Sequence, residues 1–354
     1  MDYRRIIDGQ RRDPLAVVAR SALRIAAIPY GAAVRLRNRR YDSQRLPIHR
    51  AGVPVISVGN LTAGGTGKTP MVAAIAAHLR GRGLRVGLVS RGYRSDESGS
   101  NDEARELYDR IPDVPHVQNP DRVEAARVVV EELEMEAIVL DDGFQHRRLH
   151  RDLDVVLIDA TCPFGYGHLL PRGLLREPLT ALARADAIVI SRASRTDAAR
   201  RAAIRQTIAK HAPQAIIAEA DHVPARLIRH TGAETAAAGE ALASLHNRPL
   251  AAFAGLGNPQ PFFDSLSELG GRVIATRALA DHCPYDRPTV ESLDEWLGEL
   301  RQSEPELLAV CTHKDLVKLR TDRLGGTPLR ALAIELRLTA GEAEFWQAIE
   351  RVVE

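Results

Sequence analysis

The chain has 354 residues, of which 45% are hydrophobic and 27% charged, a composition typical of an ordinary globular protein long enough for two domains. Aromatic residues make up only 4%, too few for the stacking surfaces of single-stranded nucleic-acid binders, so we expect no nucleic-acid partner. The formal net charge of +2 conceals a basic start, because the first fifty residues hold twelve arginines and four acids.

The cysteines and the apolar runs indicate the compartment. Cys162, Cys283 and Cys311 are few, odd in number and widely separated, which argues against a disulfide framework and a cysteine metal cluster. A reducing cytosol therefore fits best. No uninterrupted apolar run reaches the roughly 18 residues of a membrane span, and arginines interrupt the start of the chain, unlike a signal peptide. We therefore expect neither.

The first predicted element is a basic amphipathic helix, with Asp13 as its N-cap and Pro14 as its first residue. Arginines occupy one face, and Pro29 and Gly31 are expected to interrupt the helix. Such a helix can lie in a membrane interface with its arginines on anionic headgroups, or pack on the domain with a solvated face. Both interpretations stay open. The apolar residues that recur at helical spacing are Leu15, Val18, Ala22, Ile25 and Ala26.

A phosphate-binding loop follows the predicted strand Val55–Val58 and precedes a predicted helix over Met71–Leu79. Its glycines let successive N–H groups point at an anion, and the helix N-terminus adds its positive dipole end. Lys68 would reach the β- and γ-phosphates, and the Thr69 hydroxyl would ligate Mg²⁺. Thr62 stands where the general motif has its first glycine. The expected nucleotide-binding residues are Thr62, Ala63, Gly64, Gly65, Thr66, Gly67, Lys68 and Thr69.

Two adjacent carboxylates, Asp141 and Asp142, end the predicted strand Ala137–Leu140. Downstream of a phosphate loop, a carboxylate at the end of a buried strand is where such folds hold Mg²⁺. Adjacent acids also repel each other unless a cation is near. We therefore predict a metal site, with a plain acidic turn as the alternative. Other expected elements are strands at 85–90, 154–159 and 187–191 and helices at 121–133 and 195–213.

Residues 163–178 alternate Gly and Pro, which predicts a long ordered loop over the strand ends. Arg172 and Arg176 in this loop suit phosphate clamping, and Glu177 is a further acid; a solvated loop is the alternative. Earlier in the chain, Asp102 and Glu103 begin a predicted helix, where a surface acid cap is the simple interpretation.

A second α/β unit is expected in the C-terminal part. Within it Asp281 precedes His282 in a turn, where an aspartate can orient an imidazole or simply cap the turn. Lys314 is followed at once by Asp315, so the Asn/Thr-Lys-x-Asp motif of GTPases is not met and ATP is the expected nucleotide. Partition-type ATPases carry a lysine where this chain has Ala63. The unit's expected strands are 249–254, 272–276 and 307–312, after short linking strands at 215–218 and 225–228.

Taken together, these motifs resemble the tetraacyldisaccharide 4'-kinase family of lipid A synthesis. The resemblance covers nearly the whole chain, and the Thr62 departure from the general phosphate-loop motif is itself typical of that family. The motifs that carry it are the basic start, Gly59–Pro70, Ser90–Tyr93, Asp102–Glu103, Asp141–His146, Phe164–Pro178, Asp281–Tyr285 and Lys314–Asp315.

The resemblance implies a kinase on the cytoplasmic face of the bacterial inner membrane. It would move the γ-phosphoryl of ATP, with Mg²⁺, to the 4'-hydroxyl of tetraacyldisaccharide 1-phosphate, a lipid A precursor. The implied fold is α/β, with a P-loop NTPase-type doubly wound sheet at 1–213, a two-stranded linker at 214–232 and a smaller α/β domain at 233–354.

Residue roles follow from the resemblance and from the needs of phosphoryl transfer. Asp102 is the first choice for accepting the sugar hydroxyl's proton, with His282 holding it in place or sharing the role and Asp281 beside that imidazole. Because His282 is expected in the other domain, this pair would assemble on closure. Two alternatives stay open: a P-loop kinase of another, soluble acceptor, and a regulatory ATP-dependent switch. The nucleotide and metal roles fall to Lys68, Thr69, Asp141, Asp142, Arg176 and Glu177.

Overall fold

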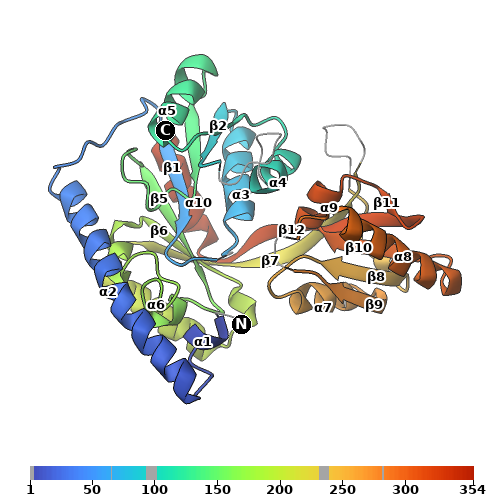
Figure 1. Ribbon diagram of the computed structural model, residues 1–354. Coiled ribbons are helices and arrows are strands. Elements are labelled where there is room, and N and C mark those ends of the chain that lie inside the picture. The colour runs from blue at the N-terminus through green and yellow to red at the C-terminus, as the bar shows by residue number, and fades with distance from the viewer. Residues whose placement is uncertain (1–3, 65, 93–101, 231–238, 281–282) are drawn as a thin grey trace. The chain divides into compact units, whose positions relative to one another are not determined.

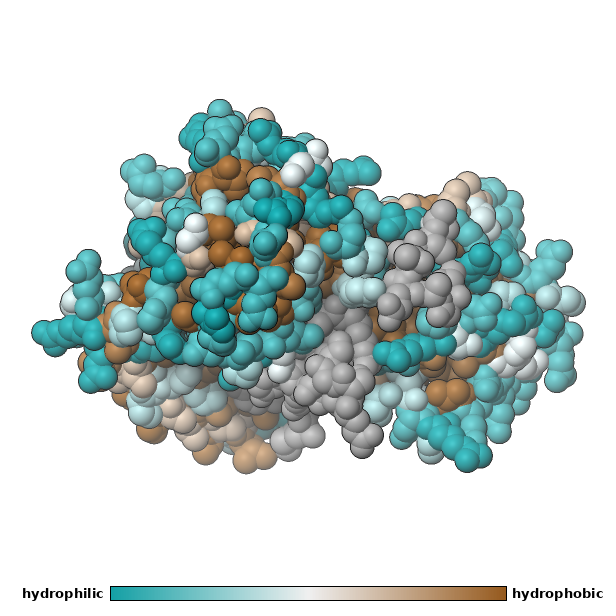
Figure 2. All heavy atoms as spheres, turned by 90° about the horizontal axis from the view of Figure 1, so that it is seen from above, coloured by the Kyte–Doolittle hydropathy of each residue, from teal (hydrophilic) through white to brown (hydrophobic). Residues whose placement is uncertain are grey.

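The computed structural model describes residues 4–64, 66–92, 102–230, 239–280 and 283–354, without the side chains of 4–5 and 102–105. The chain divides into two compact units, whose elements are labelled in Figure 1. Hydrophilic residues cover much of the face that Figure 2 shows, as the charged composition leads one to expect. Unit 1 is Met1–Tyr93, Val114–His222 and Leu336–Glu354, and unit 2 is Arg94–Asp113 and Val223–Glu335.

A parallel sheet with the order β3-β2-β4-β1-β5-β6-β7 forms the centre of unit 1. Its central strands are apolar runs that are buried along their length, as expected of parallel strands covered on both faces. This confirms the predicted P-loop-type α/β sheet. The strands are β1 (Val55–Asn60), β2 (Val86–Ser90), β3 (His116–Gln118), β4 (Ala137–Asp141), β5 (Leu153–Asp159), β6 (Ala187–Ser191) and β7 (Ile216–Ile228).

Helices cover this sheet at the places that the sequence predicts. Asp121 caps the helix expected at 121–133, which starts as α5 and ends in one π-helical turn. The helix expected at 195–213 is α6, capped by Asp197. The helices of unit 1 are α1 (Arg4–Ile7), α2 (Pro14–Asp42), α3 (Lys68–Gly81), α5 (Arg122–Arg127), the π-helical turn Val128–Glu132, α6 (Ala198–His211) and α10 (Glu342–Val353).

Helix α2 is continuous over 29 residues. Asp13 accepts a hydrogen bond from the Ala16 N–H, so the predicted cap is confirmed. The predicted interruption at Pro29 and Gly31 is wrong, because the helix runs through both. An internal proline costs a helix about 3 kcal/mol. Packing of the second half against unit 1 offsets this cost, since Gly31, Val34 and Tyr41 are buried.

The apolar face predicted for α2 is exposed rather than packed on the domain. Leu15, Val18 and Ile25 are 64%, 65% and 69% exposed. Among the described helices, α2 is the one long and apolar enough, by length and composition only, to cross a membrane, and 11% of its apolar window is buried. The sequence-based expectation of no membrane span, which rested on the lack of a long uninterrupted apolar run, therefore does not hold for this helix by that test. Figure 1 shows α2 along the edge of unit 1.

In unit 2 the strand order of the same sheet continues as β12-β10-β8-β9, with parallel pairs, and β11 pairs antiparallel with β12. One side of its core contains Phe253, Leu293 and Leu297, and the other contains Phe263 and Leu266. The three predicted strands are confirmed. The elements are α4 (Asp102–Arg110), β8 (Pro249–Ala254), α7 (Gln260–Glu268), β9 (Arg272–Ala278), α8 (Arg287–Ser303), β10 (Leu308–Thr312), α9 (His313–Leu319), β11 (Arg323–Leu324) and β12 (Thr327–Ala340).

The chain passes between the units within β7 and again within β12, which are neighbours in the strand order. The two short strands predicted at 215–218 and 225–228 are instead one continuous strand through Pro224. The C-terminal segment also belongs to unit 1, unlike in the predicted division, because α10 packs on α3. The Trp346 ring stacks on His78 with centroids 4.3 Å apart.

Candidate active site

The phosphate loop connects β1 to α3 with the backbone conformation that its glycines predict. Gly64 and Gly67 have φ of 125° and 88°. A Cβ at Gly67 would come 2.3 Å from His222 Nε2, so glycine is required there for space as well as for conformation. Helix α3 begins at Lys68, directly after the loop, and its first amides are therefore available to an anion. Residue 65 lies outside the described residues.

Side chains from neighbouring strand ends fix the loop. Asn60 Nδ2 donates to the Gly64 carbonyl at 3.3 Å, and Ser191 Oγ donates to the Thr66 carbonyl at 2.9 Å. Thr69 lies in the first turn of α3, half-buried. The predicted nucleotide-binding residues are thus anchored to the carboxyl ends of β1 and β6, where parallel α/β sheets bind ligands.

The start of the phosphate loop also pairs with the predicted long loop. Residues 61–63 run beside 174–176, because the Ala63 N–H donates to the carbonyl of residue 174 at 2.7 Å and the Arg176 N–H donates to that of residue 61 at 2.8 Å. Thr62 forms an antiparallel bridge with Leu175. This pairing places Arg176 at the phosphate loop, as the sequence predicts for a clamping arginine.

Asp142 is the centre of the site. It follows β4 with a left-handed φ of 50°, which is uncommon for a residue with a side chain. Lys68 Nζ lies 3.5 Å from its Oδ1, and Arg176 Nη1 donates to its two carboxylate oxygens at 2.9 and 2.8 Å. Burial raises the pKa of Asp142, but the charges of Lys68 and Arg176 outweigh burial and hold the pKa below its ordinary value.

The donor set around Asp142 fits Mg²⁺. Asp141 ends β4 and is 6% exposed, and the Thr69 hydroxyl belongs to the first turn of α3. Within the described ranges no group of three or more His, Cys, Asp or Glu side chains could hold a metal. Mg²⁺ is usually bound by only one or two carboxylates, together with phosphate oxygens and water. Two carboxylates and a hydroxyl beside a phosphate loop match that requirement.

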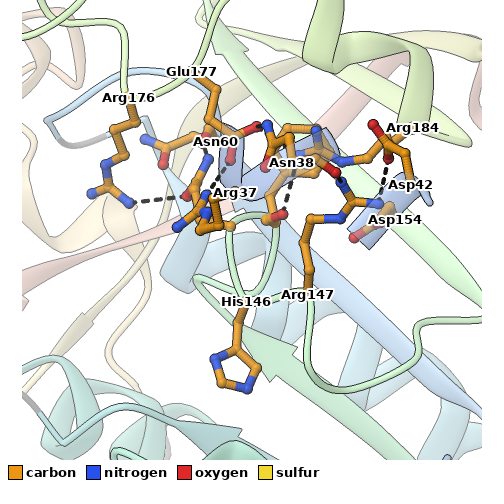
Figure 3. Close-up of polar contacts among 12 residues, drawn as sticks. Arg37, Asn38, Asp42, Asn60, His146, Arg147, Asp154, Arg176, Glu177 and Arg184 are labelled. Atoms are coloured by element: carbon orange, nitrogen blue, oxygen red, sulfur yellow. Dashed lines mark hydrogen bonds and ion pairs between the residues drawn. The ribbon is translucent and has the colours of Figure 1, made fainter. Parts of the chain in front are cut away.

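Glu177 is fully buried and fastens α2 to the long loop (Figure 3). Its Oε1 accepts from Arg37 Nη2 at 2.8 Å. Its Oε2 accepts from Asn38 Nδ2 at 3.1 Å and from Arg184 Nη2 at 2.8 Å. Both oxygens therefore have donors from the protein. The role of Glu177 as a metal ligand stays a prediction, and its observed contacts are structural.

The Glu177→Ala variant should lose stability for this reason. Removal of one partner from a buried ion pair costs about 3–5 kcal/mol, because the other charge stays buried, here that of Arg184. For a unit of this size we expect a melting temperature lower by about 6–20 °C. Differential scanning calorimetry measures the shift. Glu344→Ala, which removes an exposed acid from α10, is the control. Equal melting temperatures for both variants would contradict the assigned contacts.

The structure adds two side chains to which the sequence analysis gives no role. Gln145 Nε2 donates to the Asn60 carbonyl at 3.0 Å, and its Oε1 lies 3.5 Å from Arg176 Nη1. Arg122 is 6% exposed; burial, followed by the charge of Arg91, lowers its pKa, while the charges of Asp142 and Asp141 act in the opposite direction. Gln145 belongs to the motif after β4, which is a signal. Arg122 follows the ordinary helix cap Asp121, so the sequence gives no signal for its place near the site.

The predicted acid–base residues are placed only in part. Asp281 and His282 lie outside the described residues, and Asp102 begins α4 with its side chain also outside them. Helix α4 belongs to unit 2, unlike the expectation that Asp102 lies in the P-loop domain. The reason is that α4 packs against α9, where Asp109 Oδ2 lies 3.2 Å from His313 Nε2.

Comparison with known proteins also finds kinases. A family model described as tetraacyldisaccharide-1-P 4'-kinase matches residues 19–354. A tetraacyldisaccharide 4'-kinase of Anaeromyxobacter dehalogenans (strain 2CP-C) is 42% identical over 350 residues, 94% of this chain and 90% of that protein. One of Geobacter metallireducens is 39% identical over 314 residues, 84% of this chain and 88% of that protein.

A solved structure agrees. The crystal structure of LpxK from Aquifex aeolicus in complex with ATP has a TM-score of 0.74 and 29% sequence identity, and covers 95% of this chain and 100% of that one. The likeness extends over both units, because it covers 95% of this chain. The chain therefore belongs to the tetraacyldisaccharide-1-phosphate 4'-kinase family.

Proposed function

We propose that this chain transfers the γ-phosphoryl group of ATP to the 4'-hydroxyl of a tetraacyldisaccharide 1-phosphate, at the site around Asp142. The observation that carries the proposal is the meeting of Asp142, Lys68 and Arg176 at the phosphate loop. Phosphoryl transfer requires mainly positioning and neutralisation of charge, which such a group supplies. The names of the relatives and the ATP complex of the structural neighbour support the same reaction.

The site residues would divide these tasks between them. The loop amides and the N-terminus of α3 hold the phosphates, and Lys68 reaches the β- and γ-phosphates. Arg176 neutralises charge that spreads over the transferred group. Thr69 and Asp142, supported by Asp141, would hold Mg²⁺. When bound, the ion neutralises phosphate charge.

The acceptor side of the reaction is assigned to unit 2. Asp102 accepts the proton of the 4'-hydroxyl, whose oxygen forms the bond to the γ-phosphorus while the bond to the β–γ bridging oxygen breaks and ADP leaves. Asp281 and His282 orient Asp102 or share its proton. This assignment rests on the family motifs that contain these residues.

Transfer of labelled γ-phosphate to purified tetraacyldisaccharide 1-phosphate in mixed micelles tests both the reaction and the base. The Asp102→Asn variant should lower kcat by about 10²–10⁴-fold, the usual value of a general base. The Kd of ATP should stay nearly unchanged, since Asp102 acts on the acceptor. Asp109→Asn, on the same helix α4, is the matched control. Near-normal turnover of Asp102→Asn would remove that residue as the base.

The two alternatives predict different products in that assay. A kinase of another acceptor would leave the disaccharide unlabelled and label a soluble compound. A regulatory switch would hydrolyse ATP without labelled lipid. The comparisons give no support to either alternative, because the relatives are named as kinases of the tetraacyldisaccharide.

We propose further that α2 docks the chain on the cytoplasmic face of the inner membrane, where the lipid substrate and ATP meet. The exposed apolar face of Leu15, Val18 and Ile25 supports membrane docking over packing on the domain. Arginines beside such a face favour anionic headgroups. With the chain docked in this way, the 4'-hydroxyl of a lipid substrate in the membrane could reach ATP bound from solution.

A further inference from the structure

A cavity of about 370 Å³ lies between α2 and the long loop of unit 1. Helix α2 contributes Arg24 and Arg35, which are three helical turns apart, and the loop contributes His168 and Arg172. Among its described lining residues none is acidic. The cavity is separate from the Asp142 group, since none of the lining residues belongs to the phosphate loop or to the strand end that carries Asp142.

The positive charges of the cavity act on one another. Burial, and then the charges of Arg172 and Arg24, lower the pKa of His168. His168, Arg172 and Arg24 all line the cavity, so the positive charges of the two arginines gather on its wall. Arg172 is 8% exposed, and its Nη1 donates to the Ile7 carbonyl at 2.9 Å, which holds its guanidinium in place. An anion in the cavity would relieve this repulsion.

Gly31 shapes the cavity. A Cβ at this position would come 2.9 Å from Leu169 Cδ1 and 3.5 Å from Arg35 Nη1. The absence of a side chain thus lets the loop approach the helix and lets the Arg35 guanidinium lie over the helix backbone. The packing of Gly31 against Leu169 thus contributes to the spacing between α2 and the loop at the cavity.

The surroundings of the cavity indicate where its ligand comes from. Ile28 lines the cavity and is 66% exposed, and Ile25 beside it is 69% exposed. A ligand here would present an anionic group to the arginines and apolar chains to the exposed face of α2. Guanidinium groups bind phosphate oxygens through paired, charge-assisted hydrogen bonds. A phospholipid combines both parts.

We propose that this cavity binds the phosphate of an anionic membrane phospholipid through Arg24 and Arg35, with His168 and Arg172 as its inner wall. The proposal rests on the docking of α2 proposed above. Apolar contacts and diffuse charge alone could hold α2 on a membrane. The proposal adds a defined binding site for one lipid headgroup. The cavity would thereby select the lipid on which α2 rests and fix the rotation of the helix about its axis.

Co-sedimentation of the full chain with vesicles tests the site. On vesicles of phosphatidylcholine and phosphatidylglycerol, the double variant Arg24→Gln/Arg35→Gln should bind about tenfold more weakly than the control Arg39→Gln/Arg40→Gln. The control removes the same charge from exposed positions of the same helix outside the cavity. Equal losses in the two variants would overturn the proposal, because diffuse attraction would then account for binding.

Two further experiments test whether binding depends on the phosphate group itself rather than on surface charge, and whether it needs the volume of the cavity. Vesicles that carry oleate in place of phosphatidylglycerol have a similar surface charge without phosphate, and the wild-type chain should bind them at the level of the Arg24→Gln/Arg35→Gln variant. Gly31→Leu keeps all charges but fills the cavity, and should lose the preference for phosphatidylglycerol. Two results would contradict a phosphate site. One is equal binding of the wild-type chain to phosphatidylglycerol and oleate vesicles, and the other is an unchanged preference for phosphatidylglycerol in Gly31→Leu.

Kinase turnover in phospholipid-free detergent micelles keeps this proposal distinct from the proposed function. Arg24→Gln/Arg35→Gln should transfer labelled phosphate to the tetraacyldisaccharide with wild-type kcat and KM there. A raised KM for the disaccharide would mean that the cavity binds the substrate's own phosphate, and would overturn the phospholipid assignment. If neither the wild type nor the variant labelled the tetraacyldisaccharide, the proposed function would fail. The vesicle result would still show whether the cavity binds a phospholipid.

Discussion

Replacement of Lys68 by alanine should lower kcat by about 10³-fold, the loss typical of removing a cation that stabilises a transferring phosphoryl group. Lys68 is the first residue of α3, and its Nζ lies 3.5 Å from Asp142 Oδ1, so the charge is already aimed at the edge of the site. The alanine variant leaves the helix intact, because alanine is the best helix former. The loss should therefore appear in turnover and not in the folding of unit 1.

Single-turnover transfer of labelled γ-phosphate, with circular dichroism as the folding check, measures this effect. Lys210→Ala removes an exposed lysine from α6 and should behave as wild type. Lys68→Arg keeps the charge on a bulkier, planar group and should recover only part of the rate. A turnover of Lys68→Ala within a few-fold of wild type would mean that the loop amides and Arg176 suffice.

The Asp142→Asn variant should lower kcat by about 10²–10³-fold while ATP binds without metal at least as tightly as before. Asparagine keeps the shape of the side chain and tolerates its left-handed φ of 50°. Its neutral amide can no longer attract a divalent cation, but it also stops repelling the phosphates. The Mg²⁺ concentration for half-maximal turnover should therefore rise.

Isothermal titration with ATP in EDTA, beside turnover over a range of Mg²⁺ concentrations, distinguishes this account from a structural role for Asp142. Asp197→Asn is the control, because asparagine caps α6 as well as aspartate does. If Asp142→Asn lost ATP affinity in EDTA, its carboxylate would serve mainly to hold Lys68 and Arg176 in position.

Local features of the site could be predicted because they depend on neighbours in sequence. Glycines with positive φ, a helix after them and acids at the end of a buried strand all follow from a few adjacent residues, although the helix starts at Lys68 and not at the predicted Met71. The place of Arg176 in the nucleotide and metal region was also expected, because its loop was predicted to lie over the carboxyl ends of the parallel strands.

Features that depend on distant partners could not be predicted. Glu177 looked like a metal ligand beside Arg176, yet Arg37, 140 positions away in the sequence, accounts for one of its oxygens. Helix α2 runs through Pro29 because residues beyond it are buried. The return of α10 to unit 1 depends on Trp346 meeting His78. Hydrophobic spacing indicates that a face is buried, but it does not say against what.

The pairing of residues 61–63 with 174–176 has an entropic consequence. The two loops share backbone hydrogen bonds and a Thr62 bridge, so we expect their amides to exchange with deuterium together rather than independently. Fixing one residue's backbone costs about 1–2 kcal/mol, and this part of the phosphate loop is ordered already in the folded chain. Threonine in place of the usual glycine suits a segment that serves as a strand. Nucleotide therefore meets a segment, residues 61–63, that has little freedom left to lose.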